Sequence, residues 1–318
     1  MSMPQVSMIV PVYNHEAFAV ETVNSVLAQT YPNLQIIIVD DGSTDDSYSI
    51  IAKSFGDAIT LVRRVNGGPS AALNEGLKLA QGDYIALLGG DDVCEPDRVA
   101  HQIELFRATS NDIVFSSPTM IDSNGAILPD SSFPVLYREI PAGLNVFREL
   151  FITGNFFCAP SAMLKSSVVR QIGMFHEGLI ALQDFEYWLR ASGKGLKLST
   201  FDHRVVRYRR HSNNLTSTLS TKTTVSEAAY ILKRALDLAR PEIVRASFPH
   251  ILPYCAEQHT PLTLFEKVLL LMSHPLHDVR QIGSQLAIDL LDNEEEKEKL
   301  AGRDVNLFQM IFNATRTH

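Results

Sequence analysis

The chain has 318 residues, of which 45% are hydrophobic and 20% charged, a balance typical of a folded globular protein with a sizeable core. Its 28 basic and 36 acidic side chains give a formal charge of -8, and no basic stripe follows the sequence, so we expect no nucleic-acid partner. The three cysteines lack any CxxC spacing, which argues against a disulfide framework or a zinc site: Cys94, Cys158 and Cys255.

The N-terminal part alternates short apolar runs with helical patterns. Residues 6–12 have no polar face, which is typical of a parallel strand covered on both sides. We expect Asn14 to cap a helix whose apolar residues keep helical spacing as far as Leu27. The same pattern recurs, with strands predicted at residues 36–39, 59–62 and 83–88. Successive strand–helix units predict an α/β fold with a parallel sheet.

Carboxylates directly follow two of these strands. Asp40 and Asp41 come after the second strand, and Asp91 and Asp92 come after the fourth. Ligands bind at the carboxyl ends of parallel strands, so these acids are better placed for function than surface acids in general. One of Asp40 and Asp41 could accept hydrogen bonds from a base or ribose, while the other only holds the turn.

Two further features of this half favour a phosphate-containing ligand. Asn66-Gly67-Gly68 precedes a helix, and its glycines either let a ligand approach the backbone closely or simply form a turn. Asp91 and Asp92 have no basic residue within five positions on either side, so they repel each other unless a cation neutralises them. A divalent metal shared with a diphosphate would do so.

Four motifs occur together in this order: Val10-Pro11-Val12-Tyr13-Asn14, Val39-Asp40-Asp41-Gly42-Ser43-Thr44-Asp45, Asn66-Gly67-Gly68, and Asp91-Asp92 followed by Pro96. Through them the chain resembles the inverting glycosyltransferases of family 2. The resemblance extends to about residue 220. It implies the GT-A fold, an α/β fold in which helices flank a mostly parallel central sheet.

The resemblance also implies a nucleotide-diphospho-sugar donor, usually a uridine one. Pro11, Tyr13 and Asp41 would line the base and ribose pocket, with Tyr13 against the ring and Asp41 at its edge. Gly68 and Asp91 complete the predicted nucleotide site.

The metal site that the resemblance implies departs from the family pattern. The family's acidic motif is normally Asp-x-Asp, and Gly89 stands at its first position here. The ribose and Mn²⁺ or Mg²⁺ contacts then fall on Asp91 and Asp92, either of which could be the direct ligand. Similar enzymes carry an Arg-x-His pattern whose His reaches the metal or diphosphate, and His211 in Arg209-Arg210-His211 matches it. The arginines either face the diphosphate or decorate the surface.

Residues 183–190 predict a helix with one apolar face and Asp184 at its amino end. The helix dipole favours the charged form there, so we expect Asp184 to be ionised near neutral pH and able to accept a proton, with a simple N-cap as the alternative. In the family a Glu-Asp pair usually stands here, and its Asp is the catalytic base. Gln183 replaces the Glu, which predicts a deviation in acceptor choice.

The remaining segments carry less chemistry. We assign none to residues 116–139 and predict one strand over 196–208. Residues 153–161 form the wall between donor and acceptor in similar enzymes, and we expect Phe156 and Phe157 to belong to the core.

After residue 220 only helices are predicted, at residues 228–238, 262–272, 279–291 and 305–312. We therefore predict two domains, a catalytic domain over 1–220 and a helical region over 221–318. The helical region could bind the acceptor, form a homo-oligomer or touch a membrane. The chain shows no signal peptide and no run of roughly 18 apolar residues, which predicts a cytoplasmic protein, with peripheral contact at the inner membrane face left open.

Together these features predict a metal-dependent inverting hexosyltransferase that uses a nucleotide-diphospho-sugar, with a UDP-sugar favoured. The acceptor hydroxyl would belong to a polysaccharide or a lipid-linked glycan. Two alternatives stay open. A nucleotidyltransferase would want a Gly-rich loop with Arg and Lys where residues 11–15 stand, and a non-catalytic nucleotide-sugar-binding protein would have no need of Asp184.

Overall fold

The computed structural model describes residues 3–138, 140–141, 143–215, 221–252, 259–292 and 294. The chain divides into two compact units. The first unit, residues 1–144, 155–187 and 196–218, contains both β-sheets, and the second, residues 145–154, 188–195 and 219–318, is helical in its described part. The assignment of a catalytic domain to residues 1–220 stays a prediction.

The central sheet of the first unit is mixed and mostly parallel, because only β8 runs antiparallel to its neighbours. Its strands, in spatial order, are β3 (Thr60–Arg63), β2 (Leu34–Asp40), β1 (Val6–Val12), β4 (Tyr84–Leu87), β8 (Met163–Lys165), β6 (Ile113–Ser116) and β9 (Leu198–Phe201). A second, small sheet has the order β5 (Val93–Cys94), β10 (Val206–Arg209) and β7 (Thr119–Ile121). It joins the segment after Asp92 to the segment before His211.

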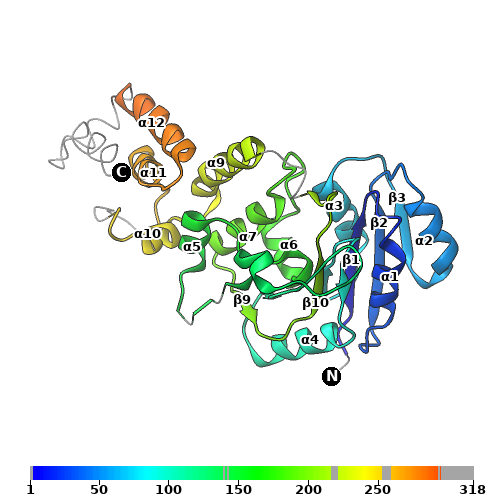
Figure 1. Ribbon diagram of the computed structural model, residues 1–318. Coiled ribbons are helices and arrows are strands. Elements are labelled where there is room, and N and C mark those ends of the chain that lie inside the picture. Colours follow the sequence, from blue (N-terminus) through cyan, green and yellow to red (C-terminus); the bar gives the residue numbers. More distant parts are fainter. Residues whose placement is uncertain are drawn as a thin grey trace. The chain divides into compact units, whose positions relative to one another are not determined.

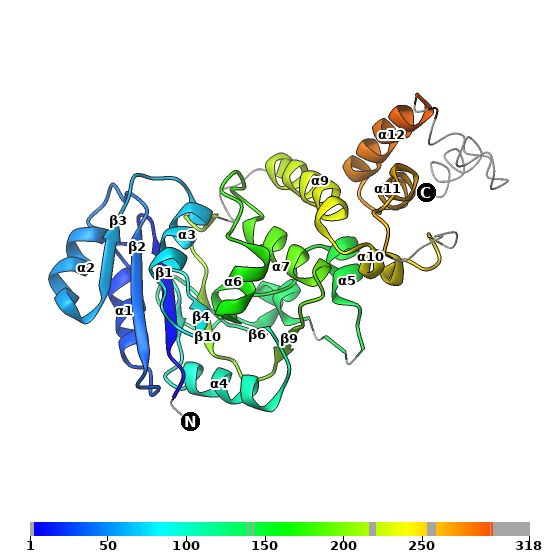
Figure 2. The ribbon, with the colours of Figure 1, turned by 180° about the vertical axis from the view of Figure 1, so that it is seen from behind.

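Helices connect and cover these strands (Figures 1 and 2). The α-helices of this part are α1 (Ala19–Leu27), α2 (Ser47–Phe55), α3 (Pro69–Leu79), α4 (Arg98–Ala108), α6 (Ser166–Ile172) and α7 (Gln183–Gly193), whose last residues fall in the second unit. Single 3₁₀ turns lie at η1 (Gly56–Ala58), η2 (Asp130–Ser132), η3 (Pro134–Tyr137) and η4 (Ala159–Ser161). The order of strands and helices confirms the predicted α/β fold.

The core forms on both faces of β1 because its residues alternate between them. Met8 and Val10 belong to one buried cluster with Val23 of α1 and Ile51 of α2. Ile9 points to the opposite face, where a Cβ at Gly76 of α3 would lie 2.3 Å from its side chain. The apolar run with no polar face therefore reflects a strand that is covered twice.

Two local predictions were wrong. Asn14 does not cap a helix: α1 begins at Ala19, and Asn14 has a φ of 55° in a turn where its side chain accepts a hydrogen bond from Thr44 N. The single strand predicted over 196–208 is two strands in different sheets, β9 and β10. A turn through Asp202 and His203 redirects the chain between them.

The helical unit contains α5 (Val146–Thr153), α9 (Thr221–Leu238), α10 (Pro241–Ser247), α11 (Leu264–Met272) and α12 (His277–Leu291). The helices predicted near 228–238, 262–272 and 279–291 are confirmed, whereas α5 and α10 were not predicted. The predicted helix at 305–312 and Cys255 lie outside the described residues. Within those residues, no helix combines the length and apolar character that crossing a bilayer requires.

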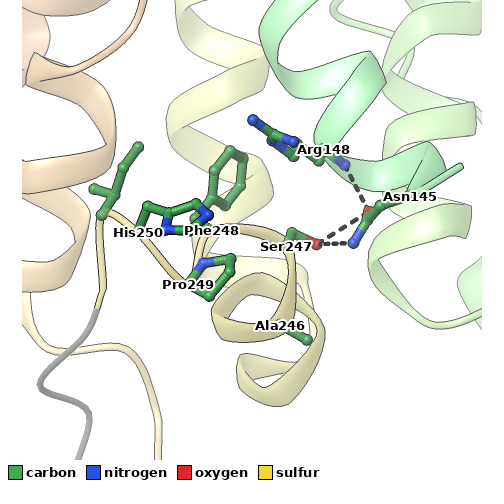
Figure 3. Close-up of a pocket in the computed structure, with 8 residues that line it drawn as sticks. Asn145, Arg148, Ala246, Ser247, Phe248, Pro249 and His250 are labelled. Carbon is green, nitrogen blue, oxygen red and sulfur yellow. Dashed lines mark hydrogen bonds between the residues drawn. The ribbon is translucent and has the colours of Figure 1, made fainter.

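The helical unit has a hollow of about 190 Å³ beside the end of α10 (Figure 3). Asn145, which caps α5 by accepting a hydrogen bond from Arg148 N, lines it and is hydrogen-bonded to Ser247. The other lining residues are Ala246, Phe248, Pro249, His250 and Ile251. We assign it no chemistry, since no carboxylate stands among the residues that line it.

Candidate active site

The turns after β1 and β2 are tied together at the carboxyl ends of these strands. Asn14 N donates to Ser43 Oγ at 3.0 Å, and His15 N donates to Ser47 Oγ at 2.8 Å. Asp41 N donates in turn to Val12 O at 2.8 Å. Tyr13 therefore lies on the turn next to Asp41, and the residue is 44% exposed.

Asp40 and Asp41 have different surroundings. Asp40 is fully buried and holds the turn, with Ser43 N at 3.3 Å and Arg63 Nε at 3.2 Å from its Oδ2. Asp41 accepts hydrogen bonds from Gly67 N and Gly68 N, the latter at 2.8 Å, and forms an ion pair with Arg64. Gly68 has a φ of 85°, a conformation that favours glycine.

Asp91, in the turn after β4, is surrounded by nitrogen atoms. His211 Nε2 and Asn214 Nδ2 each lie 3.0 Å from its Oδ2, and His15 Nε2 lies 3.9 Å from the same oxygen. Burial opposes ionisation, but the hydrogen bond from His211 and the charges of the two histidines lower the pKa of Asp91 below its ordinary value. Asp91 is therefore the ionised member of the acidic pair.

Asp92 points into the core instead. It is 2% exposed, and its Oδ1 accepts a hydrogen bond from Arg209 N at 2.9 Å. Burial, together with the charge of Asp91, raises the pKa of Asp92 well above its ordinary value. The two adjacent acids thus have opposite tendencies to ionise.

Gly89 explains how both carboxylates fit into this turn. A Cβ at this position would lie 2.5 Å from Asp92 Oδ2 and 2.9 Å from Asp91 Oδ1. Any side chain there, including the Asp usual in the family that the sequence resembles, would displace one or both carboxylates. Gly90 is similarly confined, since a Cβ added to it would lie 2.6 Å from Pro11 O.

Asp91 and His211 fit a divalent metal. They offer a carboxylate oxygen and an imidazole nitrogen 3.0 Å apart, two ligand types that divalent metals use in proteins. Within the described residues no group of three or more His, Cys, Asp or Glu side chains could hold an ion by itself. Mg²⁺ usually binds one or two carboxylates plus substrate phosphates, so a two-residue site is consistent with such an ion. Asp92, also predicted as a ligand, is buried and its Oδ1 accepts a hydrogen bond from Arg209 N, and its role as a ligand stays a prediction.

Asp184 belongs to a second cluster, at the start of α7. Its Oδ2 accepts a hydrogen bond from Asn155 Nδ2 at 2.7 Å, and its Oδ1 accepts one from Phe185 N at 2.8 Å. Desolvation outweighs these hydrogen bonds and raises the pKa of Asp184 to about 6. The helix end therefore does not keep the pKa low, although Asp184 is still mostly ionised at pH 7.

The apolar face predicted for this helix is confirmed, since Phe185, Trp188 and Leu189 are buried. Phe156 and Phe157 are also core residues, at 2% and 1% exposure, as predicted.

The structure thus brings most of the predicted site residues to one edge of the sheet. Pro11, Tyr13, Asp41 and Gly68 come from the ends of β1 and β2 and the start of α3. Asp91 and His211 lie in the segments that follow β4 and β10, and the close approach of Gly90 to Pro11 joins the two groups. Sequence reasoning missed four residues that hold this arrangement: His15, Arg64, Asn155 and Asn214. Of these, His15 directly follows the first quoted motif, and Asn155 lies in the stretch 153–161. Arg209 was considered only as an arginine that either faces the diphosphate or decorates the surface.

The family model described as "Glycosyl transferase family 2" matches residues 7–173. An uncharacterized glycosyltransferase of Rickettsia conorii is 36% identical over 192 residues, which are 58% of this chain and 31% of that protein. One from Rickettsia typhi is 35% identical over 222 residues, 68% of this chain and 67% of that protein. The chain's match therefore spans less than a third of the first relative and two thirds of the second.

Solved structures share the fold. S. aureus TarS 1-349 in complex with UDP-GlcNAc superimposes with a TM-score of 0.59 and 17% identity, over 98% of this chain and 90% of that chain. Mannosyltransferase PcManGT from Pyrobaculum calidifontis, in complex with GDP-Man and Mn²⁺, has a TM-score of 0.52 and 17% identity, over 99% of this chain and 84% of that chain. At this level of identity the likeness shows the fold alone.

Proposed function

We propose, because the chain belongs to glycosyl transferase family 2, that the protein transfers a sugar from a nucleotide-diphospho-sugar to an acceptor hydroxyl with inversion at the anomeric carbon. The observation that carries the proposal is the meeting of Asp91 and His211. These residues are 120 positions apart in sequence, yet their side chains lie 3.0 Å apart at the carboxyl end of β4. Ligands of open α/β sheets bind at this edge.

The donor would lie along the turns after β1, β2 and β4. We assign the base and ribose to Pro11, Tyr13 and Asp41, with Gly68 lining the same pocket. A UDP-sugar is the donor that we favour, and solved structures with this fold contain UDP-GlcNAc or GDP-Man.

The diphosphate would lie beside Asp91 and His211, which we propose as the protein ligands of Mn²⁺ or Mg²⁺. Asp92 supports the turn from inside. A divalent ion bound there supplies positive charge that offsets the negative charge growing on the leaving diphosphate.

Asp184 is the proposed general base. As the acceptor oxygen forms its bond to the anomeric carbon, the bond to the diphosphate oxygen breaks, and the acceptor proton passes to the Asp184 carboxylate. Asn155 and the Phe185 amide hold this carboxylate in place. The acceptor that we propose is a polysaccharide or lipid-linked glycan, and the helical second unit is the part that we assign to acceptor binding, oligomerisation or contact with a membrane surface.

Release of nucleoside diphosphate tests the proposed function. The purified chain is incubated with Mn²⁺, UDP-, GDP- and dTDP-sugars in turn, and glycan or lipid-linked acceptors. We expect one donor to give acceptor-dependent release. Tight binding of a donor with no release of nucleoside diphosphate in the presence of any acceptor would contradict the proposed transferase activity. Pyrophosphate release from a nucleoside triphosphate would favour a nucleotidyltransferase.

The raised pKa of Asp184 predicts an acidic limb in the pH profile. Below about pH 6 the carboxylate is protonated and no longer accepts a proton, so kcat/KM is expected to fall about tenfold per pH unit. Initial rates across pH 4 to 8, about two units on either side of that pKa, measure this limb. The hydrogen bond from Asn155 favours the charged form, so Asn155→Ala should move the limb to higher pH. A limb unmoved by this change would argue against Asp184 as the titrating group.

A further inference from the structure

We propose that Arg209 is a positioning residue that sets the spacing between Asp91 and His211. This inference rests on the proposed function, because it concerns the same metal and diphosphate site. It also settles the two roles left open for this arginine from sequence, since Arg209 is 1% exposed and lies under the site.

The side chain of Arg209 joins three separate segments. Its Nε donates to Asp91 O at 2.8 Å, which fixes the backbone of the acidic turn. Its Nη2 donates to Glu21 Oε2 of α1 at 2.6 Å, and its Nη1 lies 3.3 Å from Asp122 O and Ser123 O, directly after β7. All three guanidinium nitrogens are therefore engaged.

Packing extends this framework to the histidine. The guanidinium lies over the ring of Phe18, 4.9 Å from its centroid, and the same ring packs against His211, at 4.8 Å between centroids. The Arg209 amide binds the Asp92 carboxylate. Arg209 thus holds both acids. It also supports the Phe18 ring, against which His211, two positions after Arg209, packs.

Lysine could not replace this arginine. Both side chains carry a positive charge on a long apolar stem, so a lysine would still pair with Glu21. The guanidinium, however, presents five donors in one rigid plane that also stacks on an aromatic ring, whereas an ammonium group is a compact point charge with three donors. Arg209→Lys should therefore keep the fold and loosen the turn.

The chain offers a matched control in the same strand. Arg207 is exposed, and its ion pair with Glu95 lies at 2.7 Å. Mn²⁺ affinity in the presence of UDP, measured by calorimetry, is expected to fall about 10- to 100-fold in Arg209→Lys, as is usual when the support of a metal ligand is removed. Arg207→Lys should stay within about threefold of the parent, since exposed ion pairs contribute little.

Hydrogen exchange of the ligand-free protein provides a measurement that needs no metal. We expect faster exchange in residues 89–94 and 210–215 of Arg209→Lys, and parent-like exchange there in Arg207→Lys. Equal affinities or equal exchange in the two variants would overturn the positioning role. If the parent itself binds no Mn²⁺ with UDP, the favoured uridine donor or the proposed metal site is wrong, and the exchange result still decides whether Arg209 holds the turn.

Discussion

Replacing Asp184 with asparagine is expected to lower kcat by about 10²- to 10⁴-fold, the usual contribution of a general base. The two side chains have the same shape, so the packing of α7 should be preserved. The amide cannot take up the acceptor proton. Its Oδ1 can still accept from Phe185 N, but its NH₂ group would then face the NH₂ group of Asn155.

Donor binding separates this effect from a damaged fold. The residues proposed to bind the nucleotide, such as Asp41 and Asp91, belong to other elements, so the Kd for UDP should stay close to that of the parent. Asp202→Asn is the matched control, since Asp202 is an exposed residue between β9 and β10. Asp184→Asn with parent-like kcat would remove Asp184 from the mechanism. A similar loss of kcat in both variants would point to a general effect of the substitution.

The first half of the fold could be predicted because its signals are local. Residues 36–39 are apolar without interruption, and residues 6–12 are apolar apart from the small Ser7; both segments are inner strands covered on two faces. The weaker elements lack such signals. The strands β5, β7 and β8 have two or three residues each. They form because neighbouring strands pair with them, and a local sequence pattern does not show such pairing.

In the candidate site, too, residues with a local sequence signal could be predicted, and contacts between distant segments could not. Asp41, Asp91 and His211 were found because they follow strands in motif order. The hydrogen bonds that support these residues and Asp184 were missed, because each of them joins residues distant in sequence. Asn155 meets Asp184 across 29 positions, and Arg209 meets Glu21 across 188. The opposite pKa shifts of Asp91 and Asp92 could not be foreseen either, since they depend on which carboxylate turns inward.

The second large effect that we expect comes from Asp91. Asp91→Asn removes the charge of the proposed metal ligand and is expected to lower kcat/KM by about 10³-fold, because charge stabilisation by a bound metal contributes several kcal/mol. A chelator added to the parent should cause a loss of similar size. Nucleoside diphosphate release during a Mn²⁺ titration measures both effects, and Asp91→Asn should need far more Mn²⁺ than the parent.

Asp92→Asn is the control that the chain itself provides, one residue away and with the same change of chemistry. An asparagine keeps an oxygen for the hydrogen bond from Arg209 N. Asparagine is also neutral, and burial already favours the neutral, protonated form of Asp92 by raising its pKa. We therefore expect kcat/KM of Asp92→Asn to stay within about tenfold of the parent, a loss no larger than one hydrogen bond explains. If Asp92→Asn instead loses more activity than Asp91→Asn, or if Asp91→Asn responds to Mn²⁺ as the parent does, the proposed ligand is the wrong one of the two. The ion would then bind through a rearrangement that turns Asp92 outward.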